Sequence, residues 1–491
     1  MRLAVLVSVL VVTRIATAEP ISGARIAIET PVEAFTTPSP VAGISRTIYL
    51  ERCLGGCDVL GGTTNDAVNL VSTIPEPGQY RLTEFHNTTG ETGASADAEW
   101  AMVVQCMKEV YSPFDVDVTD VKPAVGPYHL AIIAGVPGEV GLAPNVLGVA
   151  PLASNCGAFD NVISFSFANA HGQSELLDRV NNLCWTAAQE SAHAFGLDHE
   201  FEFVKNGASA CNDPMTYRVD CGGQKFYRNL AARCGEDLGV RDCRCGDTQN
   251  SHKKLLSVFG LGTPIYGLPV VSMKVPSTGA TTLPSNAIAT AFSKRGILKL
   301  KLFLNGFPFA ETPGVEFGTS GQIQADYGLL VPATLPNSIY DVFVRAFDDL
   351  GDFTDTPITT VTKGAPCVSA DACLPEQRCE AGKCLWDPPV GELGDDCTFP
   401  AFCKSFICSG TADEQICTQT CEANDPEGCP SGMECTQGIC FFASGGCCSA
   451  SGEGWMHAGV LTMVVGFVLR RRRHGKSQSK RGFDRLRQPG A

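Results

Sequence analysis

The sequence predicts a multidomain chain with an α+β domain, an all-β sandwich, a group of disulfide-rich small modules and a C-terminal transmembrane helix. Three observations carry this prediction. The cysteines fall into two dense groups, the apolar spacing changes from helical to alternating near Gly262, and a short apolar run meets a cluster of arginines near the C-terminus. At 491 residues the chain is long enough for several domains.

Residues 1–18 have the pattern of a secretory signal peptide. An apolar run at 3–12 follows a basic start, and 16–18 (ATA) is a small-x-small cleavage site. We therefore expect an exported protein whose mature chain begins at Glu19. The segment 19–93 is either a propeptide or the start of the next domain.

The cysteine distribution agrees with export. Of 24 cysteines, ten lie between Cys53 and Cys245 and twelve between Cys367 and Cys440. Even numbers within each group predict disulfide frameworks formed in an oxidising compartment, rather than zinc knuckles. A free Cys53 that blocks a metal site in a latent form is an alternative.

Residues 94–262 have the pattern of the α+β domain. The segment 97–111 contains no Gly or Pro and predicts a helix, and the apolar runs at 114–118, 129–134 and 161–167 predict strands. A second, longer helix follows, with Ser174 as its expected N-cap.

The sequence QESAHAFGLDHE ends this second helix. Gln189 and His193 are four residues apart and therefore lie on one helix face, with Glu190 beside them. Gly196 is suited to leave the helix in a left-handed conformation, so that His199 returns toward the same point. This pattern is typical of a zinc site that activates a water molecule.

The segment resembles the metzincin signature H-E-x-x-H-x-x-G-x-x-H, with Gln189 in place of the first histidine. Downstream, 213–217 (DPMTY) is similar to the Met-turn of that family. The resemblance implies a metzincin-like, matrixin- or astacin-like catalytic domain: a zinc-dependent metalloendopeptidase that acts on protein or peptide substrates.

The resemblance also assigns roles to individual residues. Glu190 becomes the general base for a Zn²⁺-activated water, and Tyr217 an auxiliary ligand or transition-state donor. The metal ligands are His193, His199 and Gln189, with Gly196 at the helix exit and Met215 beneath the metal. Because Gln189 either binds zinc through its amide oxygen or marks a lost site, the alternative is a catalytically inactive, protease-like surface adhesin or binding protein.

Residues 263–364 alternate in the manner of half-buried strands, as in Leu298, Leu300 and Leu302 with lysines between them. This region resembles an Ig-like sandwich, and we expect it to act as a spacer. In the Cys-rich stalk at 365–441, cysteine spacings of six then five occur in both halves, which predicts two related small modules held by disulfides.

The C-terminus predicts localisation. A linker at 442–454 contains Cys447 and Cys448, the segment 455–473 combines an apolar stretch with an arginine cluster, and 474–491 is a basic tail. The combination resembles a MYXO-CTERM sorting signal. That resemblance implies anchoring at the cell surface or outer membrane, by the helix or by a lipid on the processed cysteine, or release into the medium.

Net charge limits the choice of partner. The chain carries a formal charge of −15, although 455–491 holds nine Lys or Arg against one Asp. The body of the protein is therefore strongly acidic, which argues against nucleic acid as a ligand.

Overall fold

The computed structural model describes residues 24–30, 43–203, 211–219, 221–236, 239–411, 414–421, 429–430 and 432–442. The predicted signal peptide, Cys447 and Cys448, the segment 455–473 and the basic tail lie outside these residues. Within the described ranges, no helix has the length and apolar character needed to cross a bilayer. The chain forms two compact units, and the domains below lie in the first, Met1–Ser431 with Cys435–Phe441, apart from Gly432–Glu434 and Phe442, which belong to the second.

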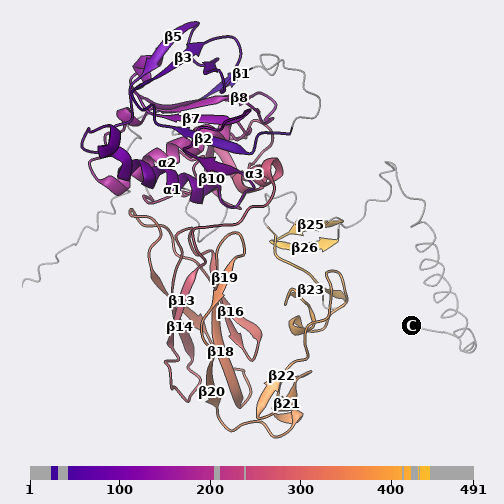
Figure 1. The fold of residues 1–491 in the computed structure, drawn as a ribbon. Coiled ribbons are helices and arrows are strands. Elements are labelled where there is room, and N and C mark those ends of the chain that lie inside the picture. The colour runs from indigo at the N-terminus through magenta and orange to yellow at the C-terminus, as the bar shows by residue number, and fades with distance from the viewer. Residues whose placement is uncertain are drawn as a thin grey trace, which may run out of the picture. The chain divides into compact units, whose positions relative to one another are not determined.

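A six-stranded mixed sheet organises the α+β domain (Figure 1). Its strands, in spatial order, are β1 (Ala24–Thr30), β8 (Val146–Ala153), β9 (Ile163–Ser166), β7 (His129–Ile133), β2 (Thr47–Glu51) and β6 (Asp117–Thr119). All neighbours pair in parallel except β8 and β9, which are antiparallel. The fully buried runs of β7 and β8 explain their nearly continuous apolar sequences.

Three helices pack into the core of this domain: α1 (Asp97–Tyr111), α2 (Leu176–His193) and α3 (Ser251–Phe259). The first matches the predicted helix at 97–111. The second begins later than expected, because Glu175 and not Ser174 is its N-cap. A disulfide between Cys106 and Cys184 joins α1 to α2, and the two helices lie side by side in Figure 1.

Two small sheets flank the main one. They contain β3 (Cys57–Gly61), β4 (Val71–Ser72) and β5 (Gly78–Leu82), and β10 (Glu200–Phe203), β11 (Ala232–Glu236) and β12 (Gly239–Arg241). The segment 43–93 therefore supplies β2 to the main sheet and β3–β5 beside it. The strand predicted at 114–118 is wrong in position, since β6 begins at Asp117.

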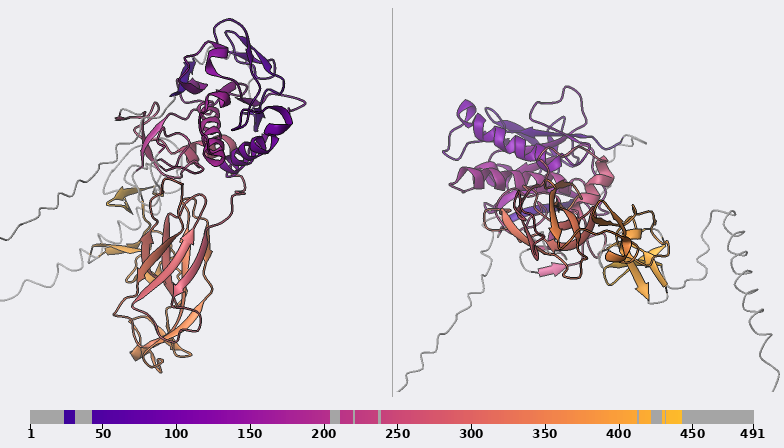
Figure 2. Two further views of the ribbon diagram at one scale, coloured as in Figure 1. Left: turned by 90° about the vertical axis from the view of Figure 1, so that its left-hand side faces the viewer. Right: turned by 90° about the horizontal axis from the view of Figure 1, so that it is seen from below.

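The next region is an antiparallel sandwich of two sheets, whose strands are visible below the α+β domain in the left view of Figure 2. One sheet contains β13 (Val270–Val275), β14 (Asn286–Phe292) and β17 (Ala325–Leu330). The other contains β16 (Phe307–Pro313), β15 (Lys299–Leu304), β18 (Ser338–Phe347), β19 (Phe353–Asp355) and β20 (Thr359–Lys363). Alternate residues of both sheets, among them Leu300 and Val342 of one and Ala289 of the other, form one core, as the alternating sequence predicts.

The cysteine-rich region forms three modules and not two. Each has four cysteines paired first to third and second to fourth: Cys367–Cys379 with Cys373–Cys384, Cys397–Cys408 with Cys403–Cys417, and Cys421–Cys435 with Cys429–Cys440. The short strands here are β21 (Arg378–Glu380), β22 (Lys383–Leu385), β23 (Cys408–Thr411), β24 (Glu414–Cys417), β25 (Met433–Thr436) and β26 (Ile439–Phe442). The spacing of six then five, from which two modules were predicted, ends the first and the third module. The middle module was missed because the interval between its last two cysteines is longer.

Five further disulfides lie in the α+β domain: Cys53–Cys57, Cys106–Cys184, Cys156–Cys245, Cys211–Cys221 and Cys234–Cys243. The bond to Cys57 overturns the alternative of a free Cys53 acting as a latency ligand. The predicted disulfide frameworks are confirmed, and they indicate an exported protein.

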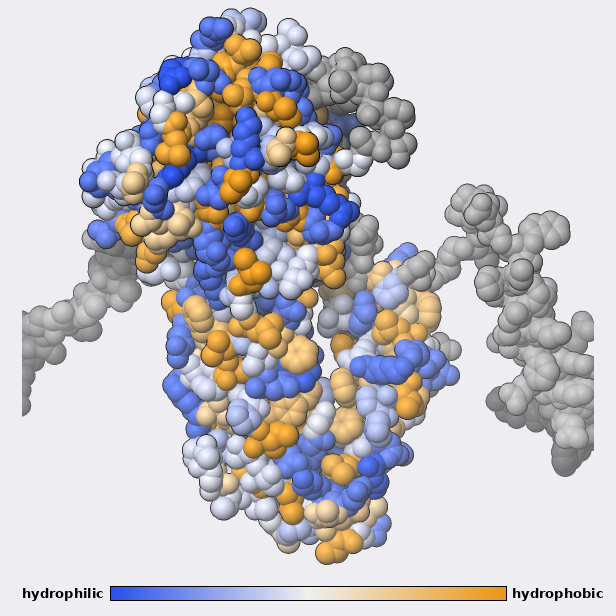
Figure 3. Space-filling model, in the orientation of Figure 1, coloured by the Kyte–Doolittle hydropathy of each residue, from blue (hydrophilic) through white to orange (hydrophobic). Residues whose placement is uncertain are grey.

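Hydrophilic and hydrophobic side chains are interspersed over the face shown in Figure 3.

Candidate metal centre

The last turn of α2 carries three of the predicted site residues. Gln189, Glu190 and His193 are all fully buried there. The helix is held in place by an apolar face that includes Val180, Leu183 and Ala187 and packs into the main core. The helix therefore presents these polar groups inside the protein rather than to solvent.

Gly196 turns the chain after α2. Its φ of +86° is left-handed, and a Cβ at this position would collide with the carbonyl of Cys156. Its amide donates to the carbonyl of His193 at 3.0 Å. No other residue type fits this turn without strain, and the turn is what brings His199 back toward the helix.

The two histidines meet at the centre of the site. Nε2 of His193 lies 3.0 Å from Nε2 of His199, and the ring centroids are 4.7 Å apart. Each Nδ1 faces an oxygen: that of His193 is 2.7 Å from the carbonyl of Leu197, and that of His199 is 3.2 Å from Oε1 of Glu236. Both Nδ1 atoms are therefore assigned as protonated donors, which leaves two Nε2 lone pairs facing one another.

Two facing lone pairs repel unless a cation lies between them. A tetrahedral zinc ion with Zn–N bonds of about 2.0–2.1 Å places two ligand nitrogens about 3.3 Å apart, close to the separation of the Nε2 atoms. Burial, followed by the neighbouring His199, lowers the pKa of His193 to about 3, so its imidazole is neutral and available as a ligand. The histidine pair therefore fits a bound metal ion.

Gln189 supplies an independent sign. Its side chain is fully buried, and within the described part of the chain neither the amide oxygen nor the amide nitrogen has a hydrogen-bond partner. An unpaired buried amide costs roughly 1–3 kcal/mol. Coordination of a cation by the amide oxygen removes part of that cost, so the donor set of two imidazoles and one amide fits Zn²⁺ with a position left for water.

Glu190 packs against the neighbouring strand β8. A Cβ added to Gly148 would lie 2.6 Å from both Cγ and Oε1 of Glu190. The glycine in β8 is thus what gives the carboxylate its space. Glu190 therefore lies on the side of α2 that faces the main sheet, next to β8. This strand also pairs with β1.

The segment resembling a Met-turn pairs with Glu200, the residue after His199. Met215 is fully buried in the main core, its amide donates to Oδ1 of Asp213 at 2.8 Å, and its carbonyl accepts from the amide of Glu200 at 2.9 Å. The Tyr217 ring lies 4.6 Å from the ring of His199. The structure therefore brings Tyr217 to the histidines, while Met215 lies in the adjoining core and is bonded to the residue after His199.

Two buried carboxyl groups, of Asp213 in the turn and Glu200 beside it, anchor this region by hydrogen bonds. Burial raises the pKa of Glu200 well above its usual range and also raises the pKa of Asp213. Asp213 accepts hydrogen bonds from the Ser251 hydroxyl at 2.6 Å and the Arg228 amide at 2.7 Å, and Glu200 accepts from Gln249 at 3.1 Å. These bonds connect the turn to α3 and to the segment before it.

Sequence reasoning did not identify Glu236, which lies on β11, 37 residues after His199. The hydrogen bond from His199 lowers the pKa of Glu236 to about 2 despite partial burial. Such a carboxylate fixes the tautomer and orientation of a ligand histidine. No fixed spacing marks it in the sequence, because only the pairing of β10 with β11 brings it to the site.

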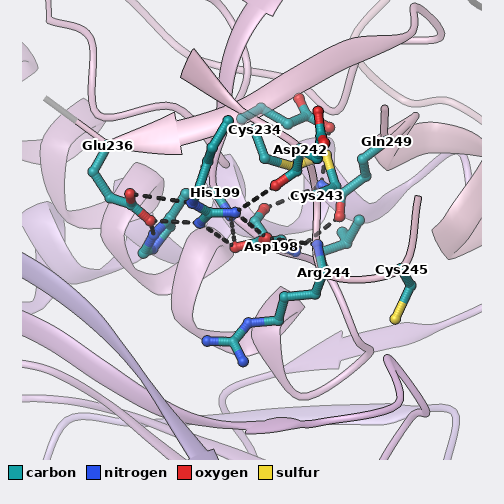
Figure 4. Close-up of polar contacts among 12 residues, drawn as sticks. Asp198, His199, Cys234, Glu236, Asp242, Cys243, Arg244, Cys245 and Gln249 are labelled. Carbon is teal, nitrogen blue, oxygen red and sulfur yellow. Dashed lines mark hydrogen bonds and ion pairs between the residues drawn. A yellow bond between two sulfur atoms is a disulfide. The ribbon is translucent and has the colours of Figure 1, made fainter. Parts of the chain in front are cut away.

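Asp198, His199 and Glu236 also form a group whose ligand atoms lie within 4.8 Å of one another and thus could hold a cation (Figure 4). Arg241 bridges the two carboxylates, however, with 2.6 Å contacts to both Asp198 and Glu236. The guanidinium already supplies the positive charge at this point. We therefore regard the group as support for His199 and not as a second metal site.

Comparisons with known proteins identify no family. No protein-family description matches the sequence, and no curated protein matches it. Among solved structures, two crystal forms of wild-type OgpA from Akkermansia muciniphila are 10% and 9% identical, cover 67% and 68% of this chain and 96% and 99% of theirs, with a TM-score of 0.18 each. Catalytically inactive OgpA in complex with an O-glycopeptide substrate, glycodrosocin, is 8% identical and covers 67% of this chain and 96% of its own, with a TM-score of 0.19. Similarity at this level supports no conclusion about fold or function.

Proposed function

We propose that the protein is an exported zinc-dependent metalloendopeptidase. The observation that carries the proposal is the pair of buried histidines, with Nε2 atoms 3.0 Å apart and each Nδ1 held by an oxygen. The unpaired amide of Gln189 on the same helix face is consistent with it. His193, His199 and Gln189 would hold the Zn²⁺ ion.

Zinc, when bound, lowers the pKa of a coordinated water toward about 7 and polarises the scissile carbonyl. The carboxylate of Glu190 takes the proton from the attacking water and passes it to the leaving amine, as a general base and then a general acid. The Tyr217 hydroxyl donates a hydrogen bond to the developing oxyanion. Glu236 keeps the His199 lone pair directed inward.

The same site supports a second candidate, a protease-like binding protein without catalysis. The observation in its favour is Gln189, because a neutral amide oxygen is a weaker zinc ligand than an imidazole. Surface anchoring through Cys447 or Cys448 and 455–473 is proposed from the sequence alone. Protein or peptide substrates remain the proposed partners, with the membrane as the site of anchoring.

The test uses residues 19–446 produced in an oxidising compartment. We expect one zinc per chain, chelator-sensitive cleavage of an unfolded protein substrate, and loss of cleavage by at least ~10²-fold in Glu190→Gln with zinc retained. Glu311→Gln, a change of an exposed glutamate in the sandwich, is the matched control. Folded protein that binds zinc at one equivalent yet cleaves no substrate would favour the binding protein, and absence of zinc would refute the metal centre.

A further inference from the structure

A buried charge cluster joins the sandwich to the α+β domain. The Asp349 carboxylate, in the turn between β18 and β19, is completely buried and accepts hydrogen bonds from Nε and Nη2 of Arg295 at 2.7 and 2.8 Å. Nη2 of Arg228 in the α+β domain lies 3.1 Å away, and the amide of Asn229 donates to Asp349 at 2.8 Å. One carboxylate of the sandwich thus holds two consecutive residues of the other domain.

The first connection from this cluster leads to the turn that contains Met215. The Arg228 amide donates to Oδ2 of Asp213 at 2.7 Å, and Oδ1 of the same carboxylate accepts from the Met215 amide at 2.8 Å. Asp213 therefore connects the segment that Asp349 holds with the Met215 amide, and the Met215 carbonyl in turn accepts from the amide of Glu200, next to His199. A shift of Arg228 would therefore also move the Asp213 carboxylate, which accepts the hydrogen bond from the Met215 amide.

The second connection leads to the helix that carries the ligands. Arg295 donates to the carbonyl of Tyr227, and the Tyr227 hydroxyl donates to the carbonyl of Ala188 at 2.8 Å. Ala188 immediately precedes Gln189 on α2. The segment 227–229 is therefore held from the sandwich side and contacts both walls of the site, the helix and the turn.

The energetics of the cluster favour a positional role. Removing two guanidinium groups and a carboxylate from water costs several kcal/mol per ion, and apolar side chains of similar size would often stabilise such an interface equally well. An apolar contact, however, does not orient a carbonyl and an amide as Arg295 and Asp349 do for Tyr227 and Asn229. What the charges add is a defined position for 227–229.

We propose that Arg295 and Asp349 are positioning residues for the metal centre, so that the sandwich is a structural part of the active site and not a spacer. The predicted effect on zinc affinity rests on the proposed function. The predicted effect on the backbone at 211–219, measured by deuterium uptake, does not. Charge at this interface is predicted to determine how firmly 211–219 and the end of α2 are held.

The test compares full-chain variants. The triple variant Arg228→Met, Arg295→Met and Asp349→Leu removes all three charges together, and Asp349→Asn is a second, conservative variant. The matched control, Arg345→Met with Asp355→Leu, removes an ion pair from the exposed side of the same sandwich. Each protein is examined for its Tm, for deuterium uptake of metal-free protein at 211–219, and for its zinc Kd.

For the triple variant we expect a Tm close to that of the wild type, deuterium uptake at 211–219 at least ~10-fold faster, and zinc affinity ~10–100-fold lower. Uptake in β14 should not change, and the control should match the wild type. Should the triple variant fail to fold, Asp349→Asn must show the faster uptake at 211–219. Wild-type uptake at 211–219 in whichever variant folds overturns the proposal. Absence of zinc binding by the wild type refutes only the proposed function. The positioning role of Arg295 and Asp349 is then still decided by deuterium uptake at 211–219.

Discussion

At the scale of single residues, the candidate site depends on which nitrogen of each histidine carries the proton. The oxygens of Leu197 and Glu236 assign both protons to Nδ1, and both Nε2 atoms are left as ligands. Leu197 stands at a variable position of the signature and Glu236 lies outside it, yet without these oxygens the histidines would have no defined tautomer. Supporting groups therefore decide the chemistry as much as the ligands do.

Substitution of the unusual ligand tests whether it faces the metal. Gln189→His should raise zinc affinity, because an imidazole is a better zinc donor than an amide. We expect an increase of at least ~10–100-fold, which is the loss typically seen when a residue that only hydrogen-bonds to a metal ligand is removed. Competition with a chromophoric chelator measures the change, and Gln105→His on α1 controls for an added histidine elsewhere. An unchanged zinc Kd would mean that residue 189 does not reach the metal.

A second prediction concerns His129, which lies on β7 with its ring 4.5 Å from that of Phe195. Burial lowers the pKa of His129 to about 3, so the folded protein holds it neutral while the unfolded chain takes up a proton below about 6.5. Protons therefore favour unfolding between pH 6.5 and 3, and stability falls as the pH falls through this window.

His129→Leu removes that contribution. The urea midpoint of the wild type should drop more between pH 7 and 4.5 than the midpoint of the variant, and His86→Leu, at a half-buried histidine, serves as the control. Equal drops in the wild type and His129→Leu would show that this imidazole is not held neutral in the fold.

At the scale of elements, the contact between α2 and β8 places Glu190, the proposed general base, beside a strand that pairs with β1. Gly148 of β8 faces Glu190, and β8 is also the strand that pairs with β1, where Arg25 is opposite Gly148. An extended peptide commonly binds by adding a strand to a sheet edge. β1 therefore occupies the edge that lies nearest to the proposed catalytic carboxylate.

Removal of β1 should consequently expose that edge. A protein beginning at Gly43 is expected to have a higher kcat/KM for peptides than one beginning at Glu19, about tenfold for each ~1.4 kcal/mol that β1 pairing contributes. A similar Tm in both proteins would exclude general unfolding as the cause. Equal or lower kcat/KM in the shorter protein would show that substrates do not use this edge.

At the scale of the whole molecule, the modules and the metal centre are built differently. All six disulfides of the modules join cysteines only 11–14 residues apart, so each module is stabilised locally. The first module packs on the sandwich, where the Asn305 amide donates to the carbonyl of Cys384. The candidate metal centre instead joins distant segments, such as His199 and Glu236, and Asp349 is bonded to the segment 227–229 beside it.

A protein ending at Pro389 tests this difference. It keeps the first module and loses the other two, together with the ring contact between Phe307 and Phe406. We expect its zinc Kd and its deuterium uptake at 211–219 to equal those of the longer protein. A weaker zinc Kd in the truncated protein would show that the later modules support the site.

The sequence by itself determined the features that depend on near neighbours along the chain. Helix periodicity places Gln189, Glu190 and His193 together, left-handed backbone demands a glycine at 196, and alternation predicts the two-sheet sandwich. Even cysteine numbers predict disulfides, although the count of modules was wrong because spacing alone does not assign pairs.

Only the tertiary structure decided which distant groups meet at the site. Glu236 reaches His199 through the pairing of β10 with β11, Gly148 makes room for Glu190 through the contact of β8 with α2, and Asp349 reaches 227–229 from another domain. The physical reason is that regular backbone geometry relates residues a few positions apart, whereas contacts across 37 or 120 positions depend on how whole elements pack.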